Sequence, residues 1–419
     1  MVRAHRRLPV RRAGGDDGRR PAASLAGYLQ KRGKLRIVRA AVCRNANSGG
    51  GGMRRTTGRY EPISWRGKVF QGFVPDPLPP VPPVDLSGSL HQQLEQALLA
   101  LGRLDAISAL LPNPELFLYG YVRREALLSS QIEGTQSSFS DLLLFEIDEA
   151  PGVPFDDVVE VSSYVAALDY GLNRLADGFP LSNRLMREIH GILLSRGRGA
   201  NKRPGEFRDE PVWIGGLNPE SAEFVPPGPA FVEPCMAELE RFLHSEVAGG
   251  VLVKAGLAHA QFETIHPFLD GNGRAGRLLI VLILAEARVL RQPLLYLSLY
   301  FKTYRSQYYR LLNATRERGD WEDWLAFFFE GVTQTAGSAV ETAHRLVELF
   351  ERDATAVRGV GRQAGTALRV LEAFRRRPLL TVKRVASESR LSYASADRGV
   401  EKLVELGIVQ EISQRGRDR

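Results

Sequence analysis

The stretch HPFLDGNGRAGR, residues 266–277, decides the fold of this 419-residue chain. A helix is expected to end before Pro267, because proline cannot continue it smoothly. The apolar run 278–285 predicts a second, buried helix after the stretch. Between the two, Gly271 and Gly273 allow left-handed backbone conformations, so successive N–H groups can converge on an anion. The sequence therefore predicts two helices with an anion site at the start of the second.

The charged side chains of this stretch suit phosphate chemistry. Arg274 and Arg277 lie three residues apart, hence on one face of the second helix, where both can reach anionic oxygens. Asp270 is a hard carboxylate of the kind that shares Mg²⁺ with phosphates. His266 is then a base beside a polyphosphate site. Each residue alone would more often be structural, but together they indicate transfer of a phosphorus group to a hydroxyl.

Nine positions of the stretch match the signature HPFx[DE]GNGRxxR, so the chain resembles the Fic (Fido) family. The resemblance implies a protein adenylyltransferase that moves AMP from ATP to a Ser, Thr or Tyr hydroxyl of a target protein, or of itself. It implies that His266 is the general base, that Asp270 binds Mg²⁺ and that Arg277 grips the γ-phosphate. The same resemblance assigns the α- and β-phosphates to Gly271, Asn272, Gly273 and Arg274. Phe268 is expected to pack in the core and fix the loop.

A second motif lies upstream, in the stretch SSQIEG at residues 129–134. By itself Glu133 would be an ordinary glutamate at a helix end. Beside a Fic core the stretch resembles the inhibitory motif [ST]xxxE[GN], which Ser129, Glu133 and Gly134 match. The resemblance implies that Glu133 pairs with Arg277 in place of the γ-phosphate and keeps ATP out of the in-line pose. The same glutamate is a candidate to orient water for the reverse removal of AMP.

Residues 207–216 resemble the β-hairpin flap of the family. An exposed edge there could pair with a target segment and align its hydroxyl by strand addition. The candidate nucleotide contacts of the flap are Val212, Trp213, Ile214 and Gly215. Tyr308 and Tyr309, downstream of the signature, are candidates to border the adenine, and Tyr309 is the one that we assign to ATP binding. Simple core packing is the alternative for these aromatic residues.

The sequence predicts a mainly α protein: a Fic/Fido helical core with a β-hairpin flap, plus a small C-terminal winged-helix domain. Residues 1–52 are expected to be a disordered basic extension and 53–95 a Pro-rich, extended arm. Residues 96–355 form the expected catalytic domain, with the inhibitory helix near 120–134. Helices are expected after Ser87 and at about 117–133, 136–146, 157–176, 181–195, 231–246, 250–265, 272–290, 302–317 and 321–351.

Residues 361–419 have the element order of a winged helix-turn-helix. Glycines near residue 360 predict a linker, and three short helices follow it at 367–374, 382–389 and 392–406. Gly407 is expected to cap the last helix, and residues 408–412 are expected to form a strand. A second wing is not recognisable before the last residue, so we also consider a truncated domain.

The net charge of +8 is unevenly distributed. Residues 1–52 carry 13 Lys/Arg and 2 Asp/Glu. Residues 53–360 carry 30 Lys/Arg and 39 Asp/Glu, so the body of the chain is acidic. The simplest explanation of the basic start is a solvated tail or upstream sequence before a start at Met53. The basic C-terminal end, with Lys383, Arg384 and Arg398, supports an alternative function, a DNA-binding transcriptional regulator with the Fic core as a sensor. Another phosphate transfer, such as phosphorylation or phosphocholination, is a third possibility.

The cysteine count and the length of the apolar runs indicate the compartment and the partners of the protein. Two cysteines, Cys43 and Cys235, are too few for a disulfide framework, so a cytoplasmic protein is expected. No apolar run is long enough to cross a bilayer, and no membrane partner is expected. The expected partners are therefore ATP and a target protein, with DNA and a second copy of the chain left open.

Overall fold

The computed structural model describes residues 55–412 except 111–113, 137, 140 and 143–154. The described chain is mostly helical, with one two-stranded hairpin, which confirms the predicted mainly α class. The expectations for residues 1–52, for the end of the chain after residue 412 and for most of the helix at 136–146 lie outside the described residues.

The hairpin lies in the segment predicted to be an extended arm, and the pairing of this segment into two strands was not predicted. Strand β1 (Gly58–Trp65) pairs antiparallel with β2 (Lys68–Pro75), with Trp65 opposite Lys68. Both turn residues, Arg66 and Gly67, have positive φ, as the tight turns that favour hairpins require. The Pro-rich part of the segment follows β2 and contains no helix or strand until α2 begins.

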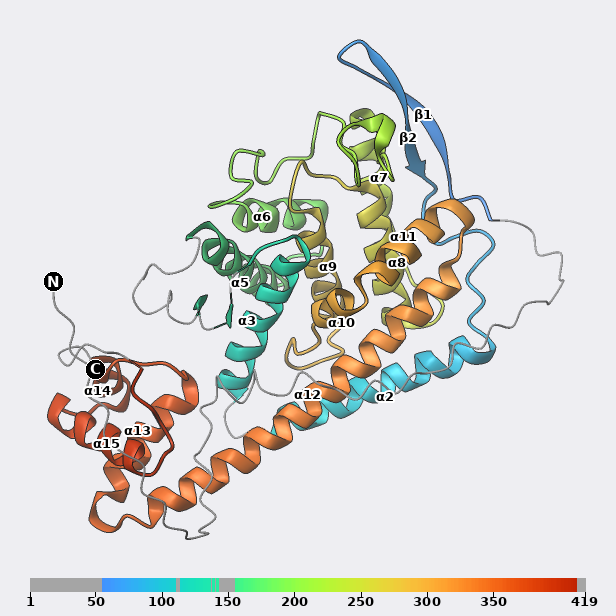
Figure 1. The fold of residues 1–419 in the computed structure, drawn as a ribbon. Helices are drawn as coiled ribbons and strands as arrows, with labels where there is room; N and C mark the ends of the chain where they lie inside the picture. Colours follow the sequence, from blue (N-terminus) through green and yellow to red (C-terminus); the bar gives the residue numbers. More distant parts are fainter. Residues whose placement is uncertain (1–54, 111–113, 137, 140, 143–154, 413–419) are drawn as a thin grey trace, which may run out of the picture.

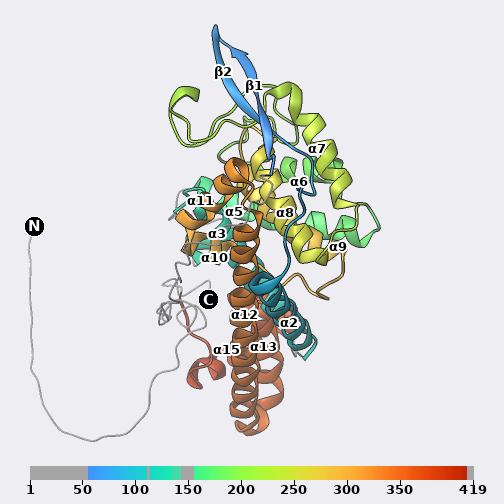
Figure 2. The ribbon, with the colours of Figure 1, turned by 90° about the vertical axis from the view of Figure 1, so that its right-hand side faces the viewer.

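Two long helices form one side of the molecule. Helix α2 (Gly88–Leu110) lies beside α12 (Trp321–Arg358), as Figures 1 and 2 show. Helix α12 begins with an aromatic run that includes Trp324 and Phe328, both fully buried. It therefore anchors the core at its start and extends well beyond it at its end.

Helices α8 (Gly250–Ile265) and α9 (Asn272–Glu286) occupy the centre, buried on nearly all sides. A helix that is apolar all round has to be enclosed by other elements. The enclosing helices are α3 (Pro114–Ile132), α5 (Phe155–Ala176), α6 (Asn183–Leu193), α7 (Pro229–Leu243), α10 (Ser298–Thr303) and α11 (Arg305–Arg318). The bounds of α8 match the prediction, and α9 ends four residues earlier than expected. The connection between α8 and α9 is the signature stretch, so the central pair positions the site.

The predicted flap is not a regular hairpin. Within the long connection between α6 and α7, Ile214 forms a single β-bridge to Phe224, and a 3₁₀ turn, η1 (Pro219–Ser221), lies between them. The connection is fastened to the hairpin, because the Phe73 N–H donates to the Val225 carbonyl at 2.9 Å. Of the strand pairing predicted around residues 207–216, the structure contains one bridge, between Ile214 and Phe224.

The C-terminal part consists of α13 (Ala364–Arg376), α14 (Val382–Ser389) and α15 (Tyr393–Glu405), at the far end of α12. Gly407 follows α15 in a left-handed conformation, as predicted for its cap. The predicted linker is only a short turn, because α12 continues to Arg358 and its Val357 packs with the C-terminal helices. The predicted strand at 408–412 is wrong: these residues pair with no described strand, and a lone strand has no ladder to stabilise it.

No helix in the described ranges is long and apolar enough to span a bilayer.

The crossing of α8 with α12 gives a test of this packing. A Cβ on Gly256 would lie 2.6 Å from Leu325 Cδ2 and 3.3 Å from the Phe328 ring, inside the core. We predict that Gly256→Val lowers the free energy of unfolding by ~2–3 kcal/mol through overpacking. The measurement is urea unfolding, and Gly337→Val on the exposed face of α12, where a Cβ meets nothing within 4 Å, is the matched control. Equal stability of the two variants would contradict the packing.

Candidate active site

The loop between α8 and α9 is held in shape by Asn272. Its side-chain amide donates to the Phe268 carbonyl and its amide oxygen accepts from the Phe268 N–H, both at 2.8 Å. These two contacts give the Asn272 side chain a structural role in the loop, beside the phosphate contact that the resemblance implied for it. Its backbone N–H, in the first turn of α9, is also placed to meet an anion.

A buried histidine that the sequence analysis missed supports the loop from α6. His190 Nδ1 accepts from the Gly205 N–H at 2.9 Å, so Nε2 carries the proton and donates to the Asp270 carbonyl at 2.9 Å. The ring stacks on Phe268, with centroids 3.6 Å apart. Burial lowers the pKa of His190 to about 4, which keeps the ring neutral. A lone histidine on an apolar helix face has no sequence pattern that would reveal this role.

Arg274 is fully buried and faces Glu160 of α5, whose Oε1 lies 2.7 Å from Arg274 Nη1. Asp270 Oδ1 is 3.8 Å from Nη2 on another side. Even so, none of the three guanidinium nitrogens has a hydrogen-bond partner. Buried donors without acceptors are costly, and the oxygens of a phosphate would satisfy them. Glu160 was also missed by the sequence analysis.

Arg277 is bound by the end of α3. Its Nε donates to Ser129 Oγ at 2.8 Å, while Nη2 donates to the Ser129 carbonyl at 3.0 Å and to Glu133 Oε1 at 2.8 Å. Burial by itself raises the pKa of Glu133, but the charge of Arg277 outweighs it and the net shift is downward. Glu133 is therefore a carboxylate, and the structure brings together the residues that the two motifs singled out.

The Glu133 carboxylate also lies over the first turn of α9. A Cβ placed on Gly273 would collide with Glu133 Oε1, so only glycine leaves room there. Gly134 follows in a left-handed conformation, where the chain turns away from α3. An internal carboxylate thus takes the position at a helix N-terminus that favours anions.

His266 ends α8 with a φ of 51°, and 21% of its side chain is exposed. Its Nδ1 is buried without a hydrogen-bond partner, so Nε2 is the nitrogen that a ligand can reach. Burial, with added repulsion from Arg208 and Arg316, lowers the pKa of His266 to about 3. The ring is therefore neutral at pH 7, the state that a general base needs.

Those two arginines cap the end of α8, where Pro267 offers no N–H to the helix. Arg208 donates to the His266 carbonyl at 2.8 Å and to the Ile265 carbonyl at 3.3 Å. Arg316 donates to the Glu263 carbonyl at 3.1 Å. Cations at the C-terminal end of a helix satisfy carbonyls that lack a helical partner. Neither arginine was recognised from the sequence.

Asp270 is the candidate metal ligand, with 34% of its side chain exposed. Its Oδ1 accepts from the Gly271 N–H at 2.6 Å. Among the described residues no group of three metal-ligating side chains occurs. One carboxylate fits Mg²⁺, which takes most of its ligands from water and substrate phosphates. The donor set thus fits an ion that arrives with a nucleotide.

The predicted nucleotide contacts lie in the connection between α6 and α7 and on α11. Val212, Trp213 and Ile214 are half-buried and Gly215 is exposed. Tyr308 packs in the core, in agreement with the alternative interpretation of this residue. It is buried, and its hydroxyl lies 2.8 Å from His259 Nε2. Tyr309 is half-buried, with its ring edge-on to that of Tyr308.

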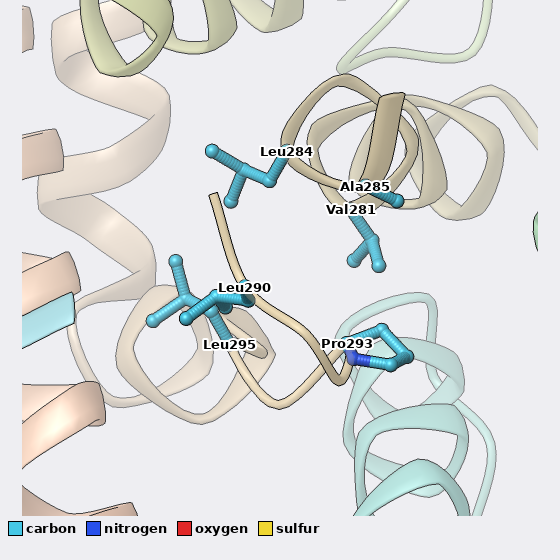
Figure 3. Close-up of a pocket in the computed structure, with 6 residues that line it drawn as sticks. All are labelled: Val281, Leu284, Ala285, Leu290, Pro293 and Leu295. Atoms are coloured by element: carbon cyan, nitrogen blue, oxygen red, sulfur yellow. The ribbon is translucent and has the colours of Figure 1, made fainter. Parts of the chain in front are cut away.

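A small crevice elsewhere in the core is not a second candidate for the nucleotide site. Figure 3 shows it between the end of α9 and the segment that follows, lined by Val281, Leu284, Ala285, Leu290, Pro293 and Leu295. Its lining side chains are all apolar, so it offers nothing to bind a nucleotide.

Comparison with known proteins agrees with this geometry. Residues 91–173 match the Fic/DOC family N-terminal domain and residues 180–284 match the Fic/DOC family domain. The chain is 31% identical over 186 residues to "Protein adenylyltransferase Fic" of Drosophila ananassae and 35% identical over 186 residues to that of Drosophila mojavensis. In each case the match covers 44% of this chain and 34% of the relative, so the chain spans about a third of the relatives' length.

A solved structure extends the likeness in fold. A Fic family protein from Desulfovibrio desulfuricans G20 superposes with a TM-score of 0.54 and 20% sequence identity. The superposition covers 80% of this chain and 96% of that protein. The two chains therefore share a fold well beyond the signature stretch.

The histidine beneath α9 gives a test of the buried polar contacts. His259 Nδ1 donates to the Gly276 carbonyl at 2.9 Å, so Nε2 accepts from Tyr308 and must stay unprotonated. Burial lowers the pKa of His259 from 6.5 to about 3. Below about pH 6.5 His259 binds a proton in the unfolded chain but not in the folded chain. The contribution of neutral His259 to the free energy of unfolding is therefore complete above pH 6.5 and is lost as the pH falls towards 3.

We predict that His259→Gln flattens the fall in the free energy of unfolding between pH 6.5 and 5, by up to ~1.4 kcal/mol per pH unit. Urea unfolding at several pH values measures this slope. His344→Gln, at an exposed position on α12, is the control and should leave the slope of the wild type unchanged. An unchanged slope in His259→Gln would contradict the assigned protonation state.

Proposed function

Because residues 91–173 and 180–284 are Fic/DOC family domains, we propose that the chain is an autoinhibited protein adenylyltransferase. It transfers AMP from ATP to a Ser, Thr or Tyr hydroxyl of a target protein or of itself. The observation that carries the proposal is the contact of Glu133 with Arg277, beside a second buried arginine, Arg274, which is paired with Glu160 but makes no hydrogen bond. Homology to proteins named protein adenylyltransferase Fic supports the same activity.

The proposed reaction uses the site in one step. His266 Nε2 takes the proton of the target hydroxyl, and the oxygen forms a bond to the α-phosphorus while the bond to diphosphate breaks. Arg274 and the N–H groups at the start of α9 hold the phosphates and stabilise the charge that develops on them. Asp270 would hold Mg²⁺, which neutralises phosphate charge when bound.

Inhibition follows from competition for one guanidinium. A γ-phosphate and the Glu133 carboxylate are both anions, and Arg277 already gives Glu133 a charge-assisted hydrogen bond. With Glu133 in place, Arg277 cannot bind the γ-phosphate of ATP. The α-phosphorus is then not held in line with the attacking hydroxyl. Displacement of the end of α3 removes this block. The same carboxylate, free of Arg277, could orient a water molecule for removal of AMP.

The segment around Trp213 is the proposed docking edge for the target. Within the described chain, residues 211–213 make no backbone–backbone hydrogen bond, although Ile214 next to them is bridged to Phe224. The Arg208 N–H donates to the Pro267 carbonyl at 2.9 Å and so ties this segment to the catalytic loop. A target strand added here would bring its hydroxyl towards His266.

DNA binding remains the alternative function for the C-terminal helices. Lys383, Arg384 and Arg398 are exposed on α14 and α15, in a helix-turn-helix arrangement. Arg384, however, is paired with Glu388, and the Arg398 guanidinium donates to the Ala394 carbonyl of its own helix. These contacts favour the enzyme as the primary function.

Labelling with ATP carrying a radioactive α-phosphate, with Mg²⁺ present, tests the proposal. We expect Glu133→Gly to raise incorporation of AMP roughly tenfold or more, because a lost charge-assisted hydrogen bond of about 1.5–3 kcal/mol frees Arg277. Glu133→Gln keeps the size of the side chain but not its charge, so it should fall between Glu133→Gly and the wild type.

Adding His266→Ala to Glu133→Gly should abolish the label. Incorporation that survives this change would refute the assigned base. An equal, low signal in the wild type and in Glu133→Gly would refute the inhibition.

A further inference from the structure

A second buried carboxyl lies on the protein side of the proposed base. Glu263 precedes His266 by three residues on α8, so the two side chains share a helix face. Glu263 is 7% exposed, and its Oε2 lies 4.0 Å from His266 Nδ1. Glu263 Oε1 and His266 Nδ1 are both buried without a hydrogen-bond partner. Two unsatisfied polar atoms thus lie on side chains that approach each other.

The fold makes room for this carboxyl. A Cβ on Gly276 of α9 would lie 2.6 Å from Glu263 Oε1, so the glycine leaves the gap that the carboxyl fills. Among the described residues, His266 is the only basic side chain within 4.0 Å of the Glu263 carboxylate. A glutamate buried for stability would be expected to have a cation or donors of its own. Glu263 instead has the imidazole.

The backbone carbonyl of Glu263 is the competing acceptor for His266 Nδ1. Its helical partner would be the N–H of residue 267, which is a proline, so Arg316 donates to this carbonyl instead, at 3.1 Å. A carbonyl oxygen accepts two hydrogen bonds, so this carbonyl also attracts the His266 ring, and the Glu263 carboxyl is the second acceptor that faces Nδ1.

We propose, on the basis of the adenylyltransferase activity proposed above, that Glu263 is a positioning residue for His266. Its carboxylate accepts the Nδ1–H of the neutral ring, which leaves the Nε2 lone pair free for the target hydroxyl. When Nε2 takes the hydroxyl proton, the oxygen forms its bond to the α-phosphorus and diphosphate leaves with the electrons of the broken bond. Glu263 stabilises the imidazolium that results, and Nε2 later releases the proton to water.

The charge on Glu263 depends on the groups around it. These are Arg277 from α9, Glu133 from α3, Arg316 and Tyr308 from α11, and His259 and His266 from α8 itself. Burial raises the pKa of Glu263 to about 7 against the attraction of Arg277. The carboxyl is therefore protonated at acidic pH and becomes an acceptor for Nδ1–H above neutrality.

The pH dependence of AMP transfer is the first test, in the Glu133→Gly background. We expect kcat to rise with pH through a midpoint below about 7, because Glu133→Gly removes a charge that raises the pKa of Glu263. Adding Glu263→Gln should lower kcat roughly ten- to a hundredfold and remove this rise, with KM for ATP changed less than about threefold, since a positioned acid–base group contributes about 10²–10⁴-fold. Glu263→Asp, which keeps the charge, should restore part of kcat and the rise. An unchanged kcat and pH profile in Glu263→Gln would overturn the proposal.

The tautomer of His266 is a second test that needs no transfer activity. Nitrogen NMR of the wild-type protein labelled at histidine, with the His266 signal assigned from His266→Ala, should show the Nδ1–H form at pH 8. Glu263→Leu, which removes the side-chain acceptor that glutamine would retain, should weaken this preference. A wild-type ring protonated at Nε2 would refute the role of Glu263, whatever the outcome of the labelling experiments. A correct tautomer in a protein that transfers no AMP would instead refute the proposed function alone.

Discussion

A buried guanidinium is stabilised by an anion beside it, and Arg277 places this demand on the whole site. It projects from the central helix α9, where water is excluded, and Glu133 and Ser129 of α3 satisfy it. Ser129 does not neutralise this charge, so loss of Glu133 destabilises the protein and leaves a positive charge that attracts another anion. Whatever displaces Glu133 must therefore bring negative charge of its own. In the proposed function the γ-phosphate of ATP brings that charge, so one contact would both complete the fold and hold the enzyme inactive.

The central helices carry other charges that are only partly compensated. Arg274 has Glu160 beside it but no hydrogen-bond partner, whereas Arg208 and Arg316 are used up as caps for α8. In the proposed function Arg274 receives a phosphate, whereas Arg208 and Arg316 fix the end of α8 around His266. Their positive charge also keeps the imidazole neutral. The surrounding helices make this possible by holding each guanidinium in a fixed position.

The part of the site that is local in sequence could be predicted. The helix–loop–helix of residues 266–277 follows from proline and glycine, and the pairing of Glu133 with Arg277 follows from a second motif 144 residues away. The missed residues are single side chains without a pattern, namely His190, Glu160, Arg208 and Arg316. Tertiary packing alone gives them their roles.

The errors in the fold have a similar cause. The prediction of an extended arm did not include the pairing of β1 with β2, and residues 408–412 suggested a strand where no described partner exists. Whether an extended segment becomes a strand depends on its neighbour in space, which a short sequence pattern does not specify.

Calorimetric titration of ATP and ADP, each with Mg²⁺, tests the central claim most directly. If Glu133 occupies the place of the γ-phosphate, the wild type should bind the two nucleotides with nearly equal affinity, whereas Glu133→Gly should bind ATP roughly tenfold or more tightly than ADP. A wild type that already prefers ATP to the same degree would show that Arg277 is free to reach the γ-phosphate, and would contradict the account.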